Sequence, residues 1–281
     1  MNTKRLNAGF EMPILGIGTF GFGGEHEANY SNDEECITAI RNALELGYTS
    51  IDTAEVYGGG HTEELVAEAI ENYDRKKLFI TTKVYKTNLH YEDVIKSAKA
   101  SIERMKIEYI DLYLIHSSNP EIPIQETMKA LNKLVEMGLV KNIGVCNFSI
   151  EELKEVQKYS KYKIVVNQMK YSLWTKTPPD IKTMEYCQKN DIMITAYKVL
   201  GRGKINEEKI QLITNLAKKY EKTEAQVMIN WIISKKNTVA IFASKKISHL
   251  KENLGALRFK MDSSDYEKID LLVGKNDSLN N

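Results

Sequence analysis

Eight short β-rich runs recur along the chain, and no other feature limits its fold as strongly. They begin near Ile14, Tyr48, Leu78, Ile110, Val140, Ile164, Ile192 and Thr238. Most are almost continuously apolar, which is typical of parallel strands buried on both faces. Amphipathic patterns of helical period lie between them, as in residues 31–46, where Ile37, Ile40 and Leu44 form one stripe. Because β-then-α units repeat without a break, we expect eight parallel strands closed into a barrel with the helices outside.

Short-range sequence patterns predict where several helices begin and what the first residues form. Three pairs have the spacing of a capping box, namely Ser31 with Glu34, Ser149 with Glu152, and Thr223 with Gln226. Residues 3–13 do not fit the repeat and look like a small β-hairpin, which we expect to close the lower end of the barrel. No linker rich in Pro, Gly or Ser divides the chain, so residues 1–281 are predicted to form a single domain.

Composition excludes several classes of protein. The 281 residues include 39 Lys and Arg against 38 Asp and Glu, and a net charge of +1 provides no field to hold nucleic acid or an anionic membrane. The cysteines Cys36, Cys146 and Cys187 have no paired spacing, which argues against disulfides or a zinc site and favours a reducing compartment. No apolar run approaches the roughly 20 residues that span a bilayer. We therefore expect a cytoplasmic protein with no metal, nucleic-acid or membrane partner.

Polar side chains stand at the expected strand ends, where the active site of such a barrel lies. The second run ends at Asp52, with Tyr57 five residues later, the third at Lys83 and the fourth at His116. Singly, each has an ordinary explanation: a loop cap, a lysine that reaches water, a histidine near the core. Together these ordinary explanations do poorly, because a random barrel should not place a carboxylate, a lysine and a histidine at three successive strand ends. Lys83 is the most informative of the three, because it would be half buried and would need a partner such as Asp52.

This set of residues suits proton transfer to an oxyanion. Tyrosine is a weak acid at neutral pH unless a cation stabilises its phenolate. Lys83 can supply that cation, with Asp52 holding Lys83 and His116 orienting the substrate. The sequence has no obvious nucleophile–base pair and no metal-ligand cluster. A proton donor without a nucleophile indicates carbonyl reduction, with a hydride from a cofactor.

Six motifs occur in an order that resembles the aldo-keto reductase superfamily: IDTAEVYG, TTKV, DLYLIH, GVCNFS, VNQMKYSLW and TAYKVLGRG. The likeness runs from the hairpin to the ENLGAL segment near the C-terminus. It implies a (β/α)8 TIM barrel, a catalytic tetrad of Asp52, Tyr57, Lys83 and His116, and NADPH bound across the barrel mouth. Tyr57 would be the general acid in the reduction of an aldehyde or ketone.

The resemblance also implies the cofactor contacts. Asn147 and Gln168 match the side chains that bind the nicotinamide carboxamide, and Tyr197 matches the ring that stacks on it. Residues 200–203 resemble the cover over the pyrophosphate, and residues 244–253 the segment that holds the adenosine and its 2′-phosphate. The expected set is Gly18, Thr19, Asp52, Asn147, Gln168, Tyr197, Leu200, Gly201, Arg202, Ser244, Lys245, His249, Glu252 and Asn253. Residues 16–21 also match G-x-G-x-x-G, but the next helix signal lies ten residues later, so we reject a Rossmann site.

The chain departs from the family pattern in the phosphate region. Phe242 and Ala243 stand where Ile-Pro-Lys or Ile-Pro-Gly is usual, and His249 where arginine is common. Lys245 and Lys246 can compensate only as point charges, so we expect NADPH to be preferred by a narrower margin than in arginine-bearing members, with NADH as an alternative cofactor.

Two further departures have open roles. Cys146 replaces a common serine, and we expect a tolerated small residue rather than a redox switch. Lys198 follows the stacking tyrosine where serine is common, and it can either contact the cofactor phosphates or point into solvent.

The expected substrate pocket consists of Phe20, Phe22, Tyr85, Ser117 and Trp174. Ser117 stands where many members have tryptophan, and few residues follow Phe259 to form a long C-terminal loop. Both features favour an open site that accepts small aldehydes. We expect a monomer or a weak oligomer.

Two other functions stay open. Lys83 could form a Schiff base, as in a barrel aldolase, but this leaves Asn147, Gln168 and Tyr197 without a purpose. The chain could instead be a nicotinamide-binding subunit that senses redox state with little turnover. The four filled tetrad positions favour catalysis.

Overall fold

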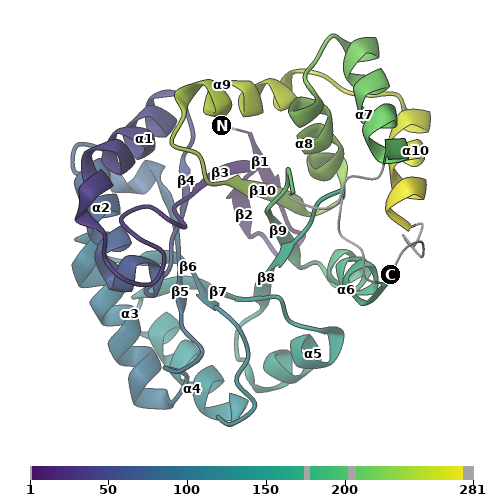
Figure 1. Ribbon diagram of the computed structural model, residues 1–281. Helices are drawn as coiled ribbons and strands as arrows, with labels where there is room; N and C mark the ends of the chain where they lie inside the picture. The colour runs from purple at the N-terminus through teal and green to yellow at the C-terminus, as the bar shows by residue number, and fades with distance from the viewer. Residues whose placement is uncertain (1, 174–177, 202–206, 275–281) are drawn as a thin grey trace.

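Eight parallel strands form a closed barrel in the computed structural model, which describes residues 2–173, 178–201 and 207–274. Their order around the barrel is β10-β3-β4-β5-β6-β7-β8-β9, and Figure 1 looks into it. The strands are β3 (Leu15–Gly18), β4 (Ser50–Asp52), β5 (Phe79–Val84), β6 (Ile110–Ile115), β7 (Val140–Cys146), β8 (Ile164–Lys170), β9 (Met193–Tyr197) and β10 (Thr238–Phe242). Each begins within two residues of a run identified in the sequence, so the predicted (β/α)8 TIM barrel is confirmed.

Helices surround the barrel and cover its outer surface (Figure 1). They are α1 (Asp33–Glu45), α2 (His61–Ile70), α3 (Tyr91–Met105), α4 (Ile124–Glu136), α5 (Ile150–Tyr159), α6 (Pro178–Lys189), α7 (Glu207–Tyr220), α8 (Glu224–Ser234), α9 (Ile247–Leu254) and α10 (Ser263–Gly274). The stripe of Ile37, Ile40 and Leu44 is buried against the strands, as its spacing predicts. None of the helices in the described parts of the chain is both long and apolar enough to cross a membrane.

Two of the three predicted capping boxes form. Ser149 and Glu152 bond reciprocally at the start of α5, and Thr223 and Gln226 do so at the start of α8. The prediction at Ser31 is wrong, because a 3-10 turn (Tyr30–Asn32) precedes α1 and the Asn29 side chain accepts a hydrogen bond from the Ser31 amide. Asparagine commonly bonds to the backbone two residues onward, and here this bond displaces the start of α1 to Asp33.

An antiparallel hairpin precedes the barrel, as predicted. Strands β1 (Thr3–Arg5) and β2 (Glu11–Pro13) pair with Thr3 opposite Pro13. Leu6, Phe10 and Met12 are buried in one apolar cluster with residues of the barrel interior, including Phe79 at the start of β5. The hairpin therefore closes the end where the strands begin. The opposite end carries the carboxyl ends of all eight strands.

Candidate active site

A cavity of about 370 Å³ opens at the carboxyl ends of the strands. It is lined by Gly18, Thr19, Phe20, His26, Asp52, Val56, Tyr57, Tyr85, His116, Asn147, Gln168, Tyr197, Lys198, Ile241 and Ala243. Three of the four predicted catalytic residues are in this lining. The fourth, Lys83, is fully buried beneath it.

Lys83 and Asp52 form a buried ion pair at the base of the cavity. The Lys83 ammonium donates hydrogen bonds to Asp52 Oδ1 at 2.6 Å and to the Thr53 carbonyl oxygen at 2.7 Å. Burial alone would lower the pKa of Lys83, but the adjacent Asp52 carboxylate outweighs it and raises that pKa above its usual range. A protonated, inaccessible amine cannot attack a carbonyl, so the geometry argues against the Schiff-base function.

Tyr57 lies above this pair, in a 3-10 turn (Tyr57–Gly60) that follows β4. Gly58 adopts φ = 55°, and a Cβ there would lie 2.6 Å from the Gly23 carbonyl oxygen, so glycine is needed to seat the turn. The Lys83 ammonium is 5.2 Å from the centroid of the Tyr57 ring.

The sequence led us to expect that Lys83 makes Tyr57 a stronger acid, but the pKa of Tyr57 is raised. Burial raises the pKa of Tyr57, and the Lys83 charge opposes this rise without cancelling it, partly because Asp52 offsets Lys83. Tyr57 is therefore protonated at neutral pH, as a proton donor must be. Lys83 favours the phenolate that is left after the proton is given away.

His116 completes the group from the end of β6. Its ring lies edge-on to Tyr57, with centroids 5.7 Å apart, and its Nδ1 is buried without a hydrogen-bond partner among the described residues. Burial, reinforced by the Lys83 charge, lowers the pKa of His116 to about 3. A neutral imidazole can bond to a substrate oxygen without carrying a competing charge.

Amide side chains line the other side of the cavity. Gln168 Nε2 donates to Asp52 Oδ2 at 2.6 Å, and the Tyr197 hydroxyl donates to Asn147 Oδ1 at 3.0 Å. The Asn147 amide nitrogen makes no hydrogen bond to a described residue, so it remains available as a donor. Asn147 also has φ = 57°, which is uncommon for a residue other than glycine. Uncommon backbone conformations of this kind cluster at active sites and ligand sites. A donor, an acceptor and an aromatic ring fit the carboxamide and ring of a nicotinamide.

A second cavity of about 720 Å³ adjoins the first, and both include Phe20, Lys198, Ile241 and Ala243. It is lined by Phe20, Lys170, Lys198, Val199, Leu200, Gly201, Ile241, Phe242, Ala243, Ser244, His249, Glu252 and Asn253. Most of the predicted phosphate and adenosine positions thus lie together. The two adjoining cavities together have room for a long cofactor.

Not every predicted cofactor residue lines this cavity. Lys245 bonds to Glu35 at 3.0 Å, and its ammonium stands 5.8 Å from the centroid of the Phe22 ring. Ser244 and His249 do line it, and the Ser244 hydroxyl and His249 Nδ1 form a hydrogen bond of 3.3 Å. Arg202 lies outside the described residues.

Only some of the predicted substrate residues line the first cavity. Phe20 and Tyr85 line the first cavity, whereas Phe22 is packed in the hydrophobic core at 2% exposure and Ser117 is not part of the lining. Phe22 lies in a turn after β3, where its amide donates to the Thr19 carbonyl oxygen at 2.9 Å, whereas Phe20 is 44% exposed. Trp174 lies outside the described residues.

Sequence reasoning missed one polar residue of the lining, His26. It lies in the loop between β3 and α1, in no recognisable motif. The only available signal was a histidine in a glycine-rich loop after a barrel strand.

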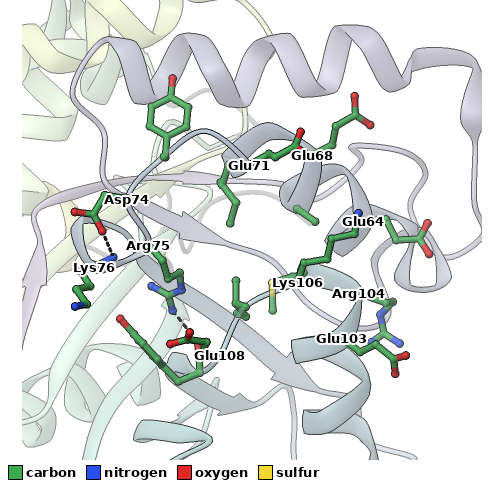
Figure 2. Close-up of a pocket in the computed structure, with 16 residues that line it drawn as sticks. Glu64, Glu68, Glu71, Asp74, Arg75, Lys76, Glu103, Arg104, Lys106 and Glu108 are labelled. Carbon is green, nitrogen blue, oxygen red and sulfur yellow. Dashed lines mark hydrogen bonds between the residues drawn. The ribbon is translucent and has the colours of Figure 1, made fainter.

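A larger hollow of about 890 Å³, drawn in Figure 2, is lined by residues of α2, of the end of α3 and of the loops that follow them. None of the four tetrad residues lines it. Its lining includes the carboxylates of Glu64, Glu68, Glu71, Asp74, Glu103 and Glu108. Two of its cations are already engaged, Arg75 with Asp111 and Arg104 with Glu63. It does not suit a polyanionic cofactor and has no paired acid and base, so we do not regard it as the active site. Within residues 2–173, 178–201 and 207–274, no group of three His, Cys, Asp or Glu side chains is placed to hold a metal ion.

Comparison with known proteins defines the class that this fold and site belong to. Residues 14–273 match the Aldo/keto reductase family. The chain therefore belongs to that family and is an NAD(P)H-dependent oxidoreductase.

Individual relatives cover nearly the whole chain. Glyoxal reductase of Bacillus subtilis (strain 168) is 32% identical over 273 residues, covering 96% of this chain and 92% of that protein. A thermostable aldo-keto reductase solved with the inhibitor epalrestat is 41% identical, with a TM-score of 0.93 over 97% of this chain and 100% of that one. An aldo-keto reductase from Klebsiella pneumoniae in complex with NADPH is 26% identical, with a TM-score of 0.84 over 97% and 95% of the two chains.

Proposed function

We propose that this protein reduces small aldehydes or ketones to alcohols, with NADPH as the cofactor and Tyr57 as the general acid. One observation carries the proposal: a single cavity is lined by catalytic and cofactor candidates together, and Lys83 lies beneath it, paired with Asp52. The lining candidates are Asp52, Tyr57, His116, Asn147, Gln168 and Tyr197. NADPH, when bound, supplies the hydride. The similarity to a glyoxal reductase supports a small carbonyl substrate.

The residues of the tetrad transfer the proton and orient the substrate. The Tyr57 hydroxyl gives its proton to the carbonyl oxygen as negative charge develops there. The nearby Lys83 ammonium stabilises the resulting phenolate, and Asp52 keeps Lys83 charged and in place. Neutral His116 holds the carbonyl oxygen by a hydrogen bond and so fixes the orientation of the substrate.

The cofactor is held by two groups of residues in this proposal. Asn147 and Gln168 bind the carboxamide while the Tyr197 ring stacks on the nicotinamide. Ser244, His249, Glu252 and Asn253 face the adenosine end, and Lys198 stands at the junction of the two cavities, where the phosphates would pass. We further propose that residues 1–281 form one domain that works as a monomer or a weak oligomer.

The test is oxidation of NADPH, followed by its absorbance, against a panel of small aldehydes and ketones. We expect turnover by the parent protein and a loss of 10²-fold or more in Tyr57→Phe, which removes only the hydroxyl. Tyr30→Phe is the matched control, because Tyr30 is 68% exposed and does not line the cavity. Full activity of Tyr57→Phe would overturn the mechanism.

The same experiment tests the sensor function. A redox-sensing subunit would bind NADPH, seen as a change in nicotinamide fluorescence, yet would turn over none of the carbonyl compounds. That combination would overturn the proposal that the chain is a working reductase.

A further inference from the structure

Tyr85 forms part of the cavity wall beside His116, the residue proposed to hold the substrate oxygen. Its ring lies edge-on to the His116 ring, with centroids 6.0 Å apart. Tyr85 lines the first cavity but not the second, where the candidates for the phosphate and adenosine contacts lie. Tyr85 follows β5, and three strands separate β5 from β9, which ends at Tyr197, in either direction around the closed barrel. In the proposed reductase, this position sets the Tyr85 ring against the part of the substrate beyond its carbonyl group.

The Glu55 carboxylate holds the backbone of Tyr85. Glu55 belongs to the loop after β4, and its amide donates to the Lys83 carbonyl oxygen at 3.3 Å, which continues the parallel pairing of β4 with β5. The next amide on this side of β5 is that of Tyr85, and it donates to Glu55 Oε1 at 2.6 Å. A side-chain oxygen thus takes the place of a backbone carbonyl one step beyond the strands. Because the acceptor is a carboxylate, this bond is about twice as strong as a bond between neutral groups.

The same oxygen closes the turn that follows Tyr85. Asn88 Nδ2 donates to Glu55 Oε1 at 3.0 Å, and the Asn88 amide donates to the Tyr85 carbonyl oxygen at 2.9 Å. Another bond holds the loop from the side of β6, where Asn119 Nδ2 donates to the Lys86 carbonyl oxygen at 3.0 Å. Removal of the Glu55 carboxylate would therefore free the Tyr85 end of the loop without detaching the loop from the barrel.

We propose that Glu55 is a positioning residue for substrate specificity. It fixes the Tyr85 ring beside His116 and so determines how tightly the enzyme binds the group that follows the carbonyl of an aldehyde. Glu55 is not among the residues that line the cavity, so it acts through Tyr85 and does not touch the substrate or the cofactor. This inference rests on the proposed reductase function and adds a determinant of its specificity.

The experiment compares 3-phenylpropanal with propanal, because the two have the same reacting aldehyde and differ by a phenyl group at the far end of the chain. The readout is the ratio of kcat/KM for 3-phenylpropanal to kcat/KM for propanal, with NADPH as the cofactor. A loss of folded or active enzyme lowers both values alike and cancels in the ratio. The Kd of NADPH is measured beside it by nicotinamide fluorescence.

The proteins are the parent, Glu55→Ala, Glu55→Gln, Tyr85→Ala and the double variant Glu55→Ala/Tyr85→Ala. Glu121→Ala is the matched control, because Glu121 is an exposed carboxylate that does not line the cavity. We expect Tyr85→Ala to lower the ratio about threefold to tenfold, the worth of one contact between aromatic rings. Glu55→Ala should lower it as well, whereas Glu55→Gln, which keeps an oxygen acceptor, and Glu121→Ala should stay near the parent.

In the Tyr85→Ala background, Glu55→Ala should cause no further fall in the ratio, because the ring that Glu55 positions is absent. The Kd of NADPH should be the same in Glu55→Ala and in the parent. An unchanged ratio in Glu55→Ala or in Tyr85→Ala, a further fall in the double variant, or a rise in the Kd of NADPH as large as the fall in the ratio would overturn the positioning role and leave the reductase function intact. Failure of the parent to reduce either aldehyde would instead overturn the reductase function, and this inference with it.

Discussion

The Lys83 ammonium lies 2.6 Å from Asp52 Oδ1 inside the barrel, where the two side chains are 0% and 3% exposed. Such a pair contributes little to stability compared with an apolar pair, because both charges must lose their hydration. The stability of the fold does not explain its presence. Proximity to Tyr57 does, since a phenolate needs a fixed positive charge beside it.

We predict that Asp52→Asn destabilises the protein by about 3 to 5 kcal/mol, because Lys83 is left charged and unpaired in the barrel. The double variant Asp52→Leu/Lys83→Met should recover most of that stability but no activity. Urea unfolding and NADPH oxidation measure the two effects. Equal stability of Asp52→Asn and the parent would contradict this account.

The buried His116 should make the protein sensitive to acid. Burial lowers the pKa of His116 to about 3 from an unfolded value near 6.5, so the unfolded chain binds the additional proton between these values. Stability supplied by this site is complete above pH 6.5 and is lost as the pH falls toward 3. Between pH 6.5 and pH 5 the loss is about 1.6 kcal/mol, or roughly 3 °C in Tm. His116→Asn should show a smaller fall in Tm over that interval, and an equal fall would contradict the assignment.

Cys146 should not act as a redox switch. Its Sγ is buried within 3.8 Å of Gln168 Oε1, and burial raises the pKa of the Cys146 thiol to about 12. Oxidants react with exposed thiolates, and this thiol is neither exposed nor ionised. Mild peroxide should therefore inactivate Cys146→Ser and the parent at the same rate. Protection of the parent by the substitution would show that the thiol reacts.

Lys198 should contribute more to cofactor affinity than Lys245. Lys198 lines both cavities and holds a left-handed backbone at φ = 54°, whereas the Lys245 ammonium already binds Glu35. We expect Lys198→Ala to raise the Kd of NADPH about fivefold to tenfold, the worth of one charge-assisted contact, and Lys245→Ala to raise it less. Nicotinamide fluorescence titration measures both, and the reverse order would refute the assignment.

The same region sets the preference between cofactors. In the proposed cofactor site, lysine and histidine would give the 2′-phosphate point charges without the bidentate fork of arginine. We expect kcat/KM to favour NADPH over NADH, and His249→Arg to widen the margin. Equal values for the two cofactors in the parent, or a preference for NADH, would contradict this expectation.

The hairpin should stabilise the fold without affecting catalysis. Phe10 is 8% exposed, and its ring lies 6.0 Å from that of Phe79 at the start of β5, the end of the barrel opposite the cavity. Phe10→Ala should cost about 3 to 5 kcal/mol in the free energy of unfolding. The KM values for NADPH and aldehyde should not change at a temperature where the variant is folded. A changed KM would mean that the hairpin reaches the site.

Periodicity in the sequence determined most of the fold. Eight apolar runs and the helical stripes between them predicted a parallel barrel, because buried parallel strands must be apolar on both faces. The capping residues Ser149 and Thr223 predicted the starts of α5 and α8, since their bonds are local. At Ser31 the local rule failed, because the neighbouring Asn29 offered the backbone an alternative bond.

The sequence by itself also determined which residues stand at the strand ends, and with them Asp52, Tyr57, Lys83 and His116. Only the tertiary structure decided how these groups act on one another. Burial raises the pKa of Tyr57 despite Lys83, and Glu35, 210 positions away along the chain, engages Lys245. The tertiary structure also buries the Phe22 side chain in the core and places His26 in the lining of the cavity. Desolvation and long-range ion pairs depend on which segments meet in space, and no local pattern of residues encodes that.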